Sequence, residues 1–398
     1  MSTSQPNKRK HEHYDVIVVG GGMVGGAAAI GLAQRGLQVL LLEARAPKPF
    51  VADQPPDLRV SALNLGSQQL LSSLGVWDTV AGMRMNPYRR LSVWEDQGRC
   101  DFSADELGLE QIGYFVENRL LQLALLEHAG RFDNLTLVTG ETVQSLKLGE
   151  TAQLVLSDGR FINAKWVIAA DGANSSLRQM AGIGTRGWRY AQQVLAVGVK
   201  TTGRDQDITW QQFTPSGPMA FLPMYDQFAE LIWYHSPSQI ERLKSLQPDA
   251  LADEIRRTFP PQLDDFEIVH HASFPIQRLH AKRYWQDNLV LVGDAAHSIN
   301  PLAGQGVNLG FKDVKALLHF VDTDKPMSAD ADLASMFRAY ERRCRTENLA
   351  MMSTMDALYV GFSNNLGPLR RLRNFGLGLA SRAPAAKRQV LRYAAGLN

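Results

Sequence analysis

Short apolar runs that are followed by glycine divide the chain into strand-like and helix-like segments. Asp15–Val19 is a run of the kind that forms a strand buried on both faces of a parallel sheet. The alanine-rich stretch Met23–Gln34 predicts a helix, and Gln38–Leu42 predicts the next strand. Two similar apolar runs occur at Trp166–Ala170 and Asn288–Val292. This alternation of strands and helices predicts an α/β fold with a parallel sheet.

The pattern changes between Trp188 and Phe274, where short stretches alternate apolar and polar residues. The stretches are Val194–Lys200, Ile208–Phe213, Met219–Met224 and Phe228–Tyr234. A period of two residues predicts an antiparallel sheet with one exposed face, here interrupted by helices near residues 238–259. We therefore expect a second, β-rich part of the molecule.

The first glycine cluster has the spacing of a dinucleotide-binding turn, GxGxxG, at Gly20, Gly22 and Gly25. The first glycine allows a tight turn, the second lets the backbone approach a pyrophosphate, and the third lets helix and strand pack closely. The N-terminus of the following helix favours phosphate. Glu43 ends the second strand, where an acid accepts hydrogen bonds from ribose hydroxyls and disfavours NADP. The motif alone does not distinguish FAD from NAD.

Two later segments have the same strand-to-turn character. Asp171-Gly172 leads into Ser175 and Arg178, a turn that would also serve simply to cap a helix. Gly293-Asp294 ends another strand, where ligands bind in open α/β sheets, and a loop from Pro301 to Gly306 follows it. An amphipathic helix is expected after this loop.

Composition excludes several classes of protein without choosing one. The chain has 398 residues, 45% of them hydrophobic, and a formal net charge of +2, which argues against disorder and against a dedicated nucleic-acid binder. Cys100 and Cys344 have no metal-ligand or dithiol spacing, so no metal site is expected. Neither a signal peptide nor a transmembrane stretch is evident, which predicts a cytoplasmic protein.

The three motifs together resemble the class A flavoprotein aromatic hydroxylases, a family typified by para-hydroxybenzoate hydroxylase. The resemblance implies a Rossmann-like FAD-binding domain with an interleaved antiparallel substrate domain and C-terminal helices. It assigns residues 14–80, 110–182 and 275–325 to the FAD domain, 81–109 and 183–274 to the substrate domain, and 326–398 to the helices. The cofactor-binding residues that it implies are Gly20, Gly22, Gly25, Glu43, Arg59, Asn118, Asp171, Gly172, Arg178, Gly293, Asp294, Gln305, Val307 and Asn308. Arg59 would read as an ordinary surface arginine without the other motifs.

Several segments narrow the resemblance to the hydroxylases of ubiquinone biosynthesis, and most closely to those that act on demethoxyubiquinol. They include Val116-Glu117-Asn118, residues 187–192 and residues 359–365. The implied substrate is a polyprenylated benzoquinol, with Trp210, Phe213, Phe221 and Pro223 as candidates to line its site. Trp233 and Tyr234 are further candidates, although about half of these aromatic residues should be ordinary core.

The chemistry implied by the resemblance belongs to the flavin, whose reduced form reacts with O₂ to give a C4a-hydroperoxide that attacks the substrate ring. Pro301, Gly304 and Gly306 would leave room beside the flavin, and no dedicated catalytic base is assigned. His297 is expected to support residues that contact the flavin, without contacting the flavin itself. The electron donor would be NAD(P)H, bound transiently, or another reductant.

Four alternatives stay open at this point. The enzyme could hydroxylate another ring position of a ubiquinone precursor, or act as a flavin dehydrogenase or reductase that does not add oxygen. It could also be a scaffold of a ubiquinone-biosynthesis complex. A flavin halogenase is disfavoured because no Trp-x-Trp-x-Ile-Pro segment occurs.

The last 42 residues contain seven basic and no acidic side chains, interleaved with apolar ones. Such a segment suits contact with an anionic membrane surface, but equally a helical pair that packs on the domain.

Overall fold

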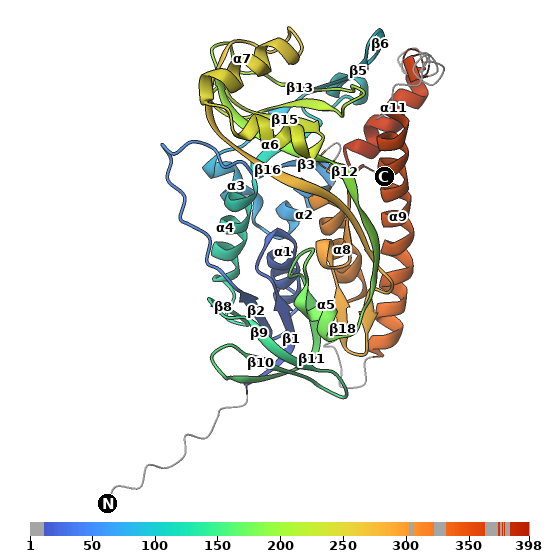
Figure 1. The fold of residues 1–398 in the computed structure, drawn as a ribbon. Helices are drawn as coiled ribbons and strands as arrows, with labels where there is room; N and C mark the ends of the chain where they lie inside the picture. The colour runs from blue at the N-terminus through green and yellow to red at the C-terminus, as the bar shows by residue number, and fades with distance from the viewer. Residues whose placement is uncertain are drawn as a thin grey trace, which may run out of the picture.

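The computed structural model describes residues 12–301, 304, 306–321, 332–362, 373–374, 376, 378 and 383–397. Within these residues the chain forms two eight-stranded sheets and one three-stranded sheet. Figure 1 shows the first sheet in the lower half of the molecule and the second in the upper half. Two long strands, β12 (Thr185–Thr201) and β16 (Phe266–Ala281), run from one half to the other.

The first sheet contains five parallel strands, in the order β18-β11-β1-β2-β8. They are β18 (Leu289–Leu291), β11 (Phe161–Ala169), β1 (Glu12–Val19), β2 (Val39–Glu43) and β8 (Leu135–Thr139). The strands β9 (Val143–Lys147), β10 (Ala152–Leu156) and β17 (Trp285–Gln286) pair at its margins in antiparallel fashion. Val16, Ile17 and Val18 have no exposed surface, as expected for a strand covered on both faces.

Helices made of small and apolar residues cover this sheet. The central one is α1 (Met23–Ala33), which packs against α4 (Asn118–Ala129) and α8 (Gly306–Phe320). A Cβ added to Gly31 would lie 2.3 Å from Leu318 Cδ1, so the absence of a side chain lets α1 and α8 approach closely. Shorter helices complete this half: α2 (Leu65–Ser73), α3 (Trp77–Met83) and α5 (Ser176–Met180).

The second sheet has the order β19-β16-β12-β15-β14-β13-β5-β6. Its other strands are β5 (Arg90–Glu95), β6 (Gly98–Ser103), β13 (Ile208–Gln212), β14 (Met219–Pro223), β15 (Phe228–His235) and β19 (His297–Ser298). All pairs are antiparallel except β13 with β5. A separate small sheet has the order β3 (Val60–Asn64), β7 (Gly113–Glu117) and β4 (Asn86–Tyr88). Two short 3₁₀ helices, η1 (Ala104–Leu107) and η2 (Gly293–Ala295), complete the list of elements.

The expectation that one face of the second sheet is exposed is wrong. The helices α6 (Pro237–Lys244) and α7 (Pro248–Thr258) place Ile240 and Ile255, both fully buried, in one core with Trp210 and Trp233 of the sheet. The apolar stripes of these two helices need a partner, and this sheet face provides it. The sheet is therefore covered on both sides over its centre.

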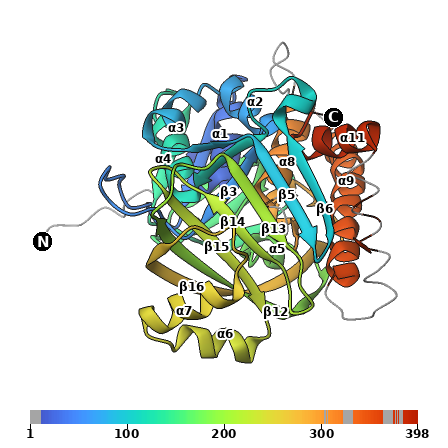
Figure 2. The ribbon, with the colours of Figure 1, turned by 90° about the horizontal axis from the view of Figure 1, so that it is seen from above.

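The C-terminal part consists of the long helix α9 (Leu333–Phe362) and α11 (Pro384–Ala394), which lie side by side in both views (Figures 1 and 2). One side of α9 is buried, and Phe337, Tyr340 and Met352 lie on that side. Of the seven basic residues in the last 42, Arg373 pairs with Glu95 and Lys387 with Glu106, at 2.6 and 2.7 Å. Arg370, Arg371 and Arg382 lie outside the described residues. In the part of the chain that the structure describes, no helix has both the length and the apolar character to cross a bilayer.

Candidate active site

The three motifs meet because their strands are neighbours. Gly20 follows β1, Asp171 follows β11, and Gly293 follows β18, and these parallel strands are adjacent in the order β18-β11-β1. Backbone hydrogen bonds continue the pairing past the strand ends, from Ala170 N to Val19 O and from Val292 N to Ala169 O. The three turns therefore lie at one edge of the sheet, where ligands bind in α/β proteins.

The glycines of the first turn have three different surroundings. Gly20 has φ +104°, and a Cβ there would lie 2.3 Å from the Ala170 carbonyl oxygen. A Cβ on Gly25 would lie 1.9 Å from the Gly20 carbonyl oxygen. In contrast, a Cβ on Gly22 would meet no atom within 4 Å, although Gly22 caps α1 with an ordinary extended backbone. The fold thus needs the first and third glycines, whereas the open space at Gly22 fits an approaching pyrophosphate.

Glu43 and Asp171 offer acceptors toward this open edge. The Glu43 Oε1 atom accepts a hydrogen bond from Arg45 N at 2.9 Å, and the residue remains partly exposed at the end of β2. Asp171 Oδ2 accepts from Ser176 N at 2.7 Å. The N-cap of α5 is Ser175, whose hydroxyl accepts from Arg178 N at 3.0 Å, as expected for a turn that caps a helix. Asp171 Oδ1 is buried and has no hydrogen-bond partner among the described residues. Gly172 beside it has φ +81°. An acceptor without a donor at this edge fits a hydroxyl-bearing ligand.

Arg178 connects two of the turns, and its expected contact with cofactor stays a prediction. It is 5% exposed, and its guanidinium donates to the carbonyl oxygens of Ala295 at 2.8 Å and Ala173 at 2.9 Å. These bonds fix the Asp171 turn against the Gly293-Asp294 turn. Arg178 thus contributes to the site by positioning the backbone.

The Gly293-Asp294 turn is held from below by Asp313 of α8. Asp313 Oδ2 accepts from Gly293 N at 2.9 Å and from His297 Nε2 at 2.5 Å, and Oδ1 accepts from Asn348 Nδ2 at 3.1 Å. Burial alone lowers the pKa of His297, but the charge and hydrogen bond of Asp313 outweigh it and raise that pKa. A buried, hydrogen-bonded histidine–aspartate pair therefore lies beneath the turn.

Asp294 lies in the turn above this pair and is exposed. The surrounding protein nevertheless desolvates its carboxylate and raises its pKa, while the charges of His297 and Arg59 act in the opposite direction. The exposed Arg59 is therefore near enough to Asp294 for their charges to interact.

The residues of the loop before α8 differ in their surroundings. Gly304 has φ +61°, and a Cβ there would lie 2.9 Å from Ala62 Cβ, whereas a Cβ on Gly306 would meet nothing within 4 Å. Pro301 is exposed and Val307 is partly buried. Gln305 lies outside the described residues. Asn308, expected to bind cofactor, is 1% exposed and uses its side chain on Ser67 Oγ at 2.7 Å and the Ala62 carbonyl at 2.8 Å.

Sequence reasoning missed the arginines that secure the segment before Arg59. Arg84 forms a buried pair with Glu117 at 2.7 Å and donates to the Gln54 carbonyl at 2.7 Å. Arg119 pairs with Asp57 at 2.7 Å and donates to the carbonyls of Lys48 and Pro49. Asn118 N donates to the Arg59 carbonyl at 2.8 Å, which places the predicted residues Asn118 and Arg59 together. No local motif marks such pairs, because their partners come from distant segments.

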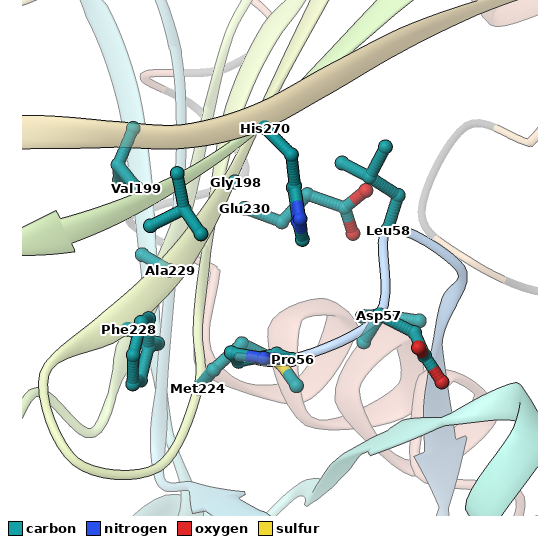
Figure 3. Close-up of a pocket in the computed structure, with 12 residues that line it drawn as sticks. Pro56, Asp57, Leu58, Gly198, Val199, Met224, Phe228, Ala229, Glu230 and His270 are labelled. Carbon is teal, nitrogen blue, oxygen red and sulfur yellow. The ribbon is translucent and has the colours of Figure 1, made fainter. Parts of the chain in front are cut away.

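A small pocket, of a volume close to that of one water molecule, lies between the segment before Arg59 and the second sheet (Figure 3). Glu230, Gly198 and His270 occupy cross-strand positions on β15, β12 and β16. Figure 3 shows the Glu230 and His270 side chains extending from the sheet toward Pro56, Asp57 and Leu58. Glu230 is 4% exposed, and burial raises its pKa well above the usual range. Burial likewise lowers the pKa of His270, so both groups favour their neutral forms.

The expected substrate-lining residues separate onto the two faces of the second sheet. Trp210 and Phe221 stack at 5.6 Å in the core under α7, so their expected role in lining the substrate site is not supported. Pro223 is buried at the end of β14, where its carbonyl accepts a hydrogen bond from Asn86. Phe213 lies in a different core with Tyr234 and Leu309, on the face turned toward α8. The split follows the period of two, which sends alternate side chains to opposite faces.

The open space at Gly22, the partly exposed Glu43 and the exposed Asp294 lie at one edge of a parallel sheet, the place where α/β folds bind dinucleotides. Residues 13–333 match the family described as FAD binding domain, and the chain belongs to this family.

Similarity to known proteins extends over nearly the whole chain. It is 47% identical over 385 residues to 3-demethoxyubiquinol 3-hydroxylase of Escherichia coli (strain K12), covering 96% of this chain and 98% of that protein. Ubiquinone hydroxylase UbiL of Rhodospirillum rubrum is 34% identical over 388 residues, covering 96% of this chain and 89% of that protein. The crystal structure of p-nitrophenol 4-monooxygenase PnpA from Pseudomonas putida shares the fold, with a TM-score of 0.80 at 17% identity, 98% of this chain and 99% of that chain being covered. The chain is therefore a flavin-dependent monooxygenase of this family.

We expect Gly22→Ala and Gly25→Ala to separate cofactor binding from folding. Gly25→Ala should lower the free energy of unfolding by about 1–3 kcal/mol, because the new Cβ would overlap a backbone oxygen. Gly22→Ala should leave the FAD-free protein within about 0.5 kcal/mol of wild type and weaken FAD binding at least about tenfold. Chemical denaturation and flavin fluorescence titration measure the two quantities. Undiminished FAD affinity in Gly22→Ala would contradict the assignment of this opening to the pyrophosphate.

We expect Glu230→Gln to change how stability depends on pH. The raised pKa means that the folded state keeps Glu230 protonated while the unfolded state ionises, so stability falls as pH rises above the unfolded value. Glutamine cannot ionise, so the variant should gain relative to wild type by up to ~1.4 kcal/mol per pH unit from about pH 4.5 upward. Denaturation at several pH values, with the exposed Glu150→Gln as control, tests this. A difference that is the same at every pH would refute a neutral Glu230.

Proposed function

We propose that this monooxygenase adds one hydroxyl group to the ring of demethoxyubiquinol, a polyprenylated benzoquinol of ubiquinone biosynthesis. The observation that carries the proposal is the similarity to the Escherichia coli 3-demethoxyubiquinol 3-hydroxylase, which is 47% identical along almost its entire length. The geometry is consistent with this reaction, because Phe213 and Tyr234 pack in one cluster with Ile299 and Leu309, which flank the loop proposed to lie along the flavin ring.

The chain provides separate contacts for each part of FAD. The Gly20–Gly22 turn and the N-terminus of α1 would hold the pyrophosphate, and Glu43 the adenosine ribose. Asp294, near Arg59, would hold the ribityl chain, and the loop with Pro301, Gly304 and Gly306 would lie along the flavin ring, with open space at Gly306. Bound FAD supplies the redox chemistry, carrying electrons from a reductant to O₂ next to the substrate. The electron donor in this proposal is NAD(P)H, bound transiently at the same edge.

The protein's own contribution is to orient the ring and exclude water. The layer between the second sheet and α9 contains Val194, Phe213, Ile276, Met351 and Met355, all buried. Such a layer can hold an apolar quinol close to the flavin loop and keep bulk solvent from the reacting atoms. Excluding water in this way favours transfer of oxygen to the substrate ring over its unproductive release.

A second candidate is hydroxylation at another ring position of a ubiquinone precursor. The 31% identity to rat ubiquinone biosynthesis monooxygenase COQ6, covering 96% of this chain and 90% of that protein, supports a place in ubiquinone biosynthesis without specifying the ring position, and so keeps this candidate. A dehydrogenase that adds no oxygen and a scaffold that does not turn over are the remaining candidates. The three catalytic candidates differ in the product that they form, and the scaffold forms none.

We expect the purified holoenzyme to incorporate one atom from ¹⁸O₂ into a short-chain demethoxyubiquinol when NAD(P)H is supplied. Mass spectrometry of the product gives the oxygen count, and NMR gives the ring position. Oxygen at another position would favour the second candidate, and oxidised product without ¹⁸O would favour a dehydrogenase. Absence of turnover with every donor tried, together with restored ubiquinone synthesis by a flavin-free variant in a deletion strain, would favour the scaffold.

Peripheral contact with an anionic membrane, or with a ubiquinone-biosynthesis complex, is part of the proposal. On α11, Arg388 and Arg392 are exposed next to Val390, which is 56% exposed, and Tyr393, which is 40% exposed. Cationic and apolar side chains on one helix suit adsorption to the surface of a membrane. This contact would bring the site to a substrate that is dissolved in lipid.

We expect Arg388→Glu to weaken binding to vesicles that contain anionic lipid, because it replaces attraction by repulsion. Each basic residue near such a surface contributes about 1 kcal/mol, so the reversal should lower vesicle affinity by roughly tenfold or more at low salt. Lys147→Glu on β9, at the other end of the molecule, is the matched control (Figure 1). Equal vesicle binding by both variants in a sedimentation assay would leave α11 as a helix that only packs on the domain.

A further inference from the structure

A cavity of about 340 Å³ lies on the side of α8 that faces α2, α9 and the C-terminal end of α11. Figure 2 shows these four helices next to one another. The volume is within the range of small-molecule sites. Among the described residues that line the cavity, none belongs to the turns after β1, β11 and β18, so it is separate from the proposed FAD contacts.

Close backbone contacts fix the walls of this cavity. Gly66 N of α2 donates to the Ala395 carbonyl at 3.2 Å, and a Cβ on Gly66 would lie 2.5 Å from the Gly396 carbonyl oxygen. Gly396 has φ +72°, and a Cβ there would lie 2.7 Å from Asn64 Oδ1. Two glycines thus let the end of α11 lie directly on the start of α2. The cavity is therefore enclosed by backbone whose position is well determined.

Three cationic side chains line the cavity: Lys312 and Lys315 of α8 and Arg343 of α9. Within the part of the chain that the structure describes, none of the three forms an ion pair. Lys312 is partly buried, and its Nζ lies 5.3 Å from the centre of the Tyr393 ring, which also lines the cavity. The cations are thus gathered around one space without carboxylate partners.

The two acidic residues of the lining do not cancel this charge. Asp313 is buried, and its oxygens accept hydrogen bonds from Gly293 N, His297 and Asn348, on the side of the flavin turns. Glu347 is exposed and close enough to Tyr393 for its charge to raise the pKa of that tyrosine, although burial contributes more. Three cations against one exposed carboxylate leave the cavity with surplus positive charge.

Apolar side chains form another part of the lining. They are Leu70 of α2 and Leu309, Phe311 and Ala316 of α8, all of them buried. A site that combines unpaired cations with an apolar wall suits a ligand that has an anionic group attached to an apolar part. A phosphate ester fits the cations well, because its several oxygens can accept hydrogen bonds from Lys and Arg together.

We propose that this cavity binds a phosphate ester, with Lys312, Lys315 and Arg343 around the phosphate and the apolar wall against the group that it carries. Two sources have this chemistry: the headgroup of an anionic phospholipid and a soluble phosphate ester. The site takes no part in the reaction at the flavin, so it does not depend on the proposed hydroxylation.

The experiment titrates the FAD-loaded full-length enzyme with three probes in a calorimeter. Monomeric dihexanoylphosphatidylglycerol represents the lipid, glycerol phosphate the soluble ester, and dihexanoylglycerol the same lipid without phosphate. Dihexanoylglycerol should bind at least about tenfold more weakly than the better of the two phosphate probes. Tighter binding of phosphatidylglycerol than of glycerol phosphate assigns the site to a lipid headgroup, and the reverse order assigns it to a soluble ester.

Two variants test whether the cavity is the place of binding. Lys315→Gln combined with Arg343→Gln should weaken the better probe about 10²-fold, roughly tenfold for each cation removed. Ala350→Trp keeps every charge but fills space in the cavity lining, and should weaken the same probe at least about tenfold. All three positions are exposed, so the variants are expected to fold, which thermal denaturation checks.

The matched control combines Lys147→Gln with Arg204→Gln, two exposed positions outside the cavity. It removes the same charge and should bind within about twofold of wild type. An equal loss of binding in this control would overturn the inference, because the attraction would then come from net charge alone. Absence of binding by both phosphate probes, or wild-type binding by the Lys315 and Arg343 double variant, would also overturn it. Failure of the enzyme to hydroxylate demethoxyubiquinol would contradict the proposed function and leave this site standing.

Discussion

The parallel pairing of β18, β11 and β1 is the interaction on which the site depends. These strands begin near residues 289, 161 and 12, and their hydrogen-bonded register aligns Leu291 with Ala169 and Ala169 with Val19. Each strand is followed by a turn, so the register alone places the three turns side by side. The strands hold this register because their side chains are buried on both faces, where a slip would disturb the packing on each side. A dinucleotide site thus follows from a packing constraint in the core.

Buried polar side chains then determine the shape of the turns. Asp313 joins Gly293, His297 and Asn348, and Arg178 joins the turns after β11 and β18. Removing one partner of such a buried group costs about 3–5 kcal/mol, a large part of the ~5–15 kcal/mol that keeps a domain folded. Stability and site geometry therefore depend on the same residues. Arg178 and Asn308, both expected to contact cofactor, likewise form buried hydrogen bonds with other parts of the chain.

The second sheet serves two purposes because its two faces carry different side chains. Trp210, Phe221 and Trp233 form a core with α6 and α7 on one face. Glu230 and Tyr234 lie on the other, together with the layer that α9 closes. The helices on the outer face support the sheet, and the inner face packs against residues of α8 and α9. A sheet exposed on one side could not provide the same support, since its outer aromatic side chains would contact water.

The sequence by itself determined the nature of the fold and of the first motif. The apolar runs around Val16, Val167 and Val290 predicted buried parallel strands, and the spacing of Gly20, Gly22 and Gly25 predicted a dinucleotide turn, because both depend on neighbours within a few residues. The family resemblance extended this to flavin and to a hydroxylase, which the similarity to known proteins confirms. Only the tertiary structure decided which aromatic residues face the site, since the face of a strand depends on what packs against it. It also decided the partners of Arg178, Asn308, Glu230 and Asp356, because contacts between segments far apart in the chain leave no local pattern.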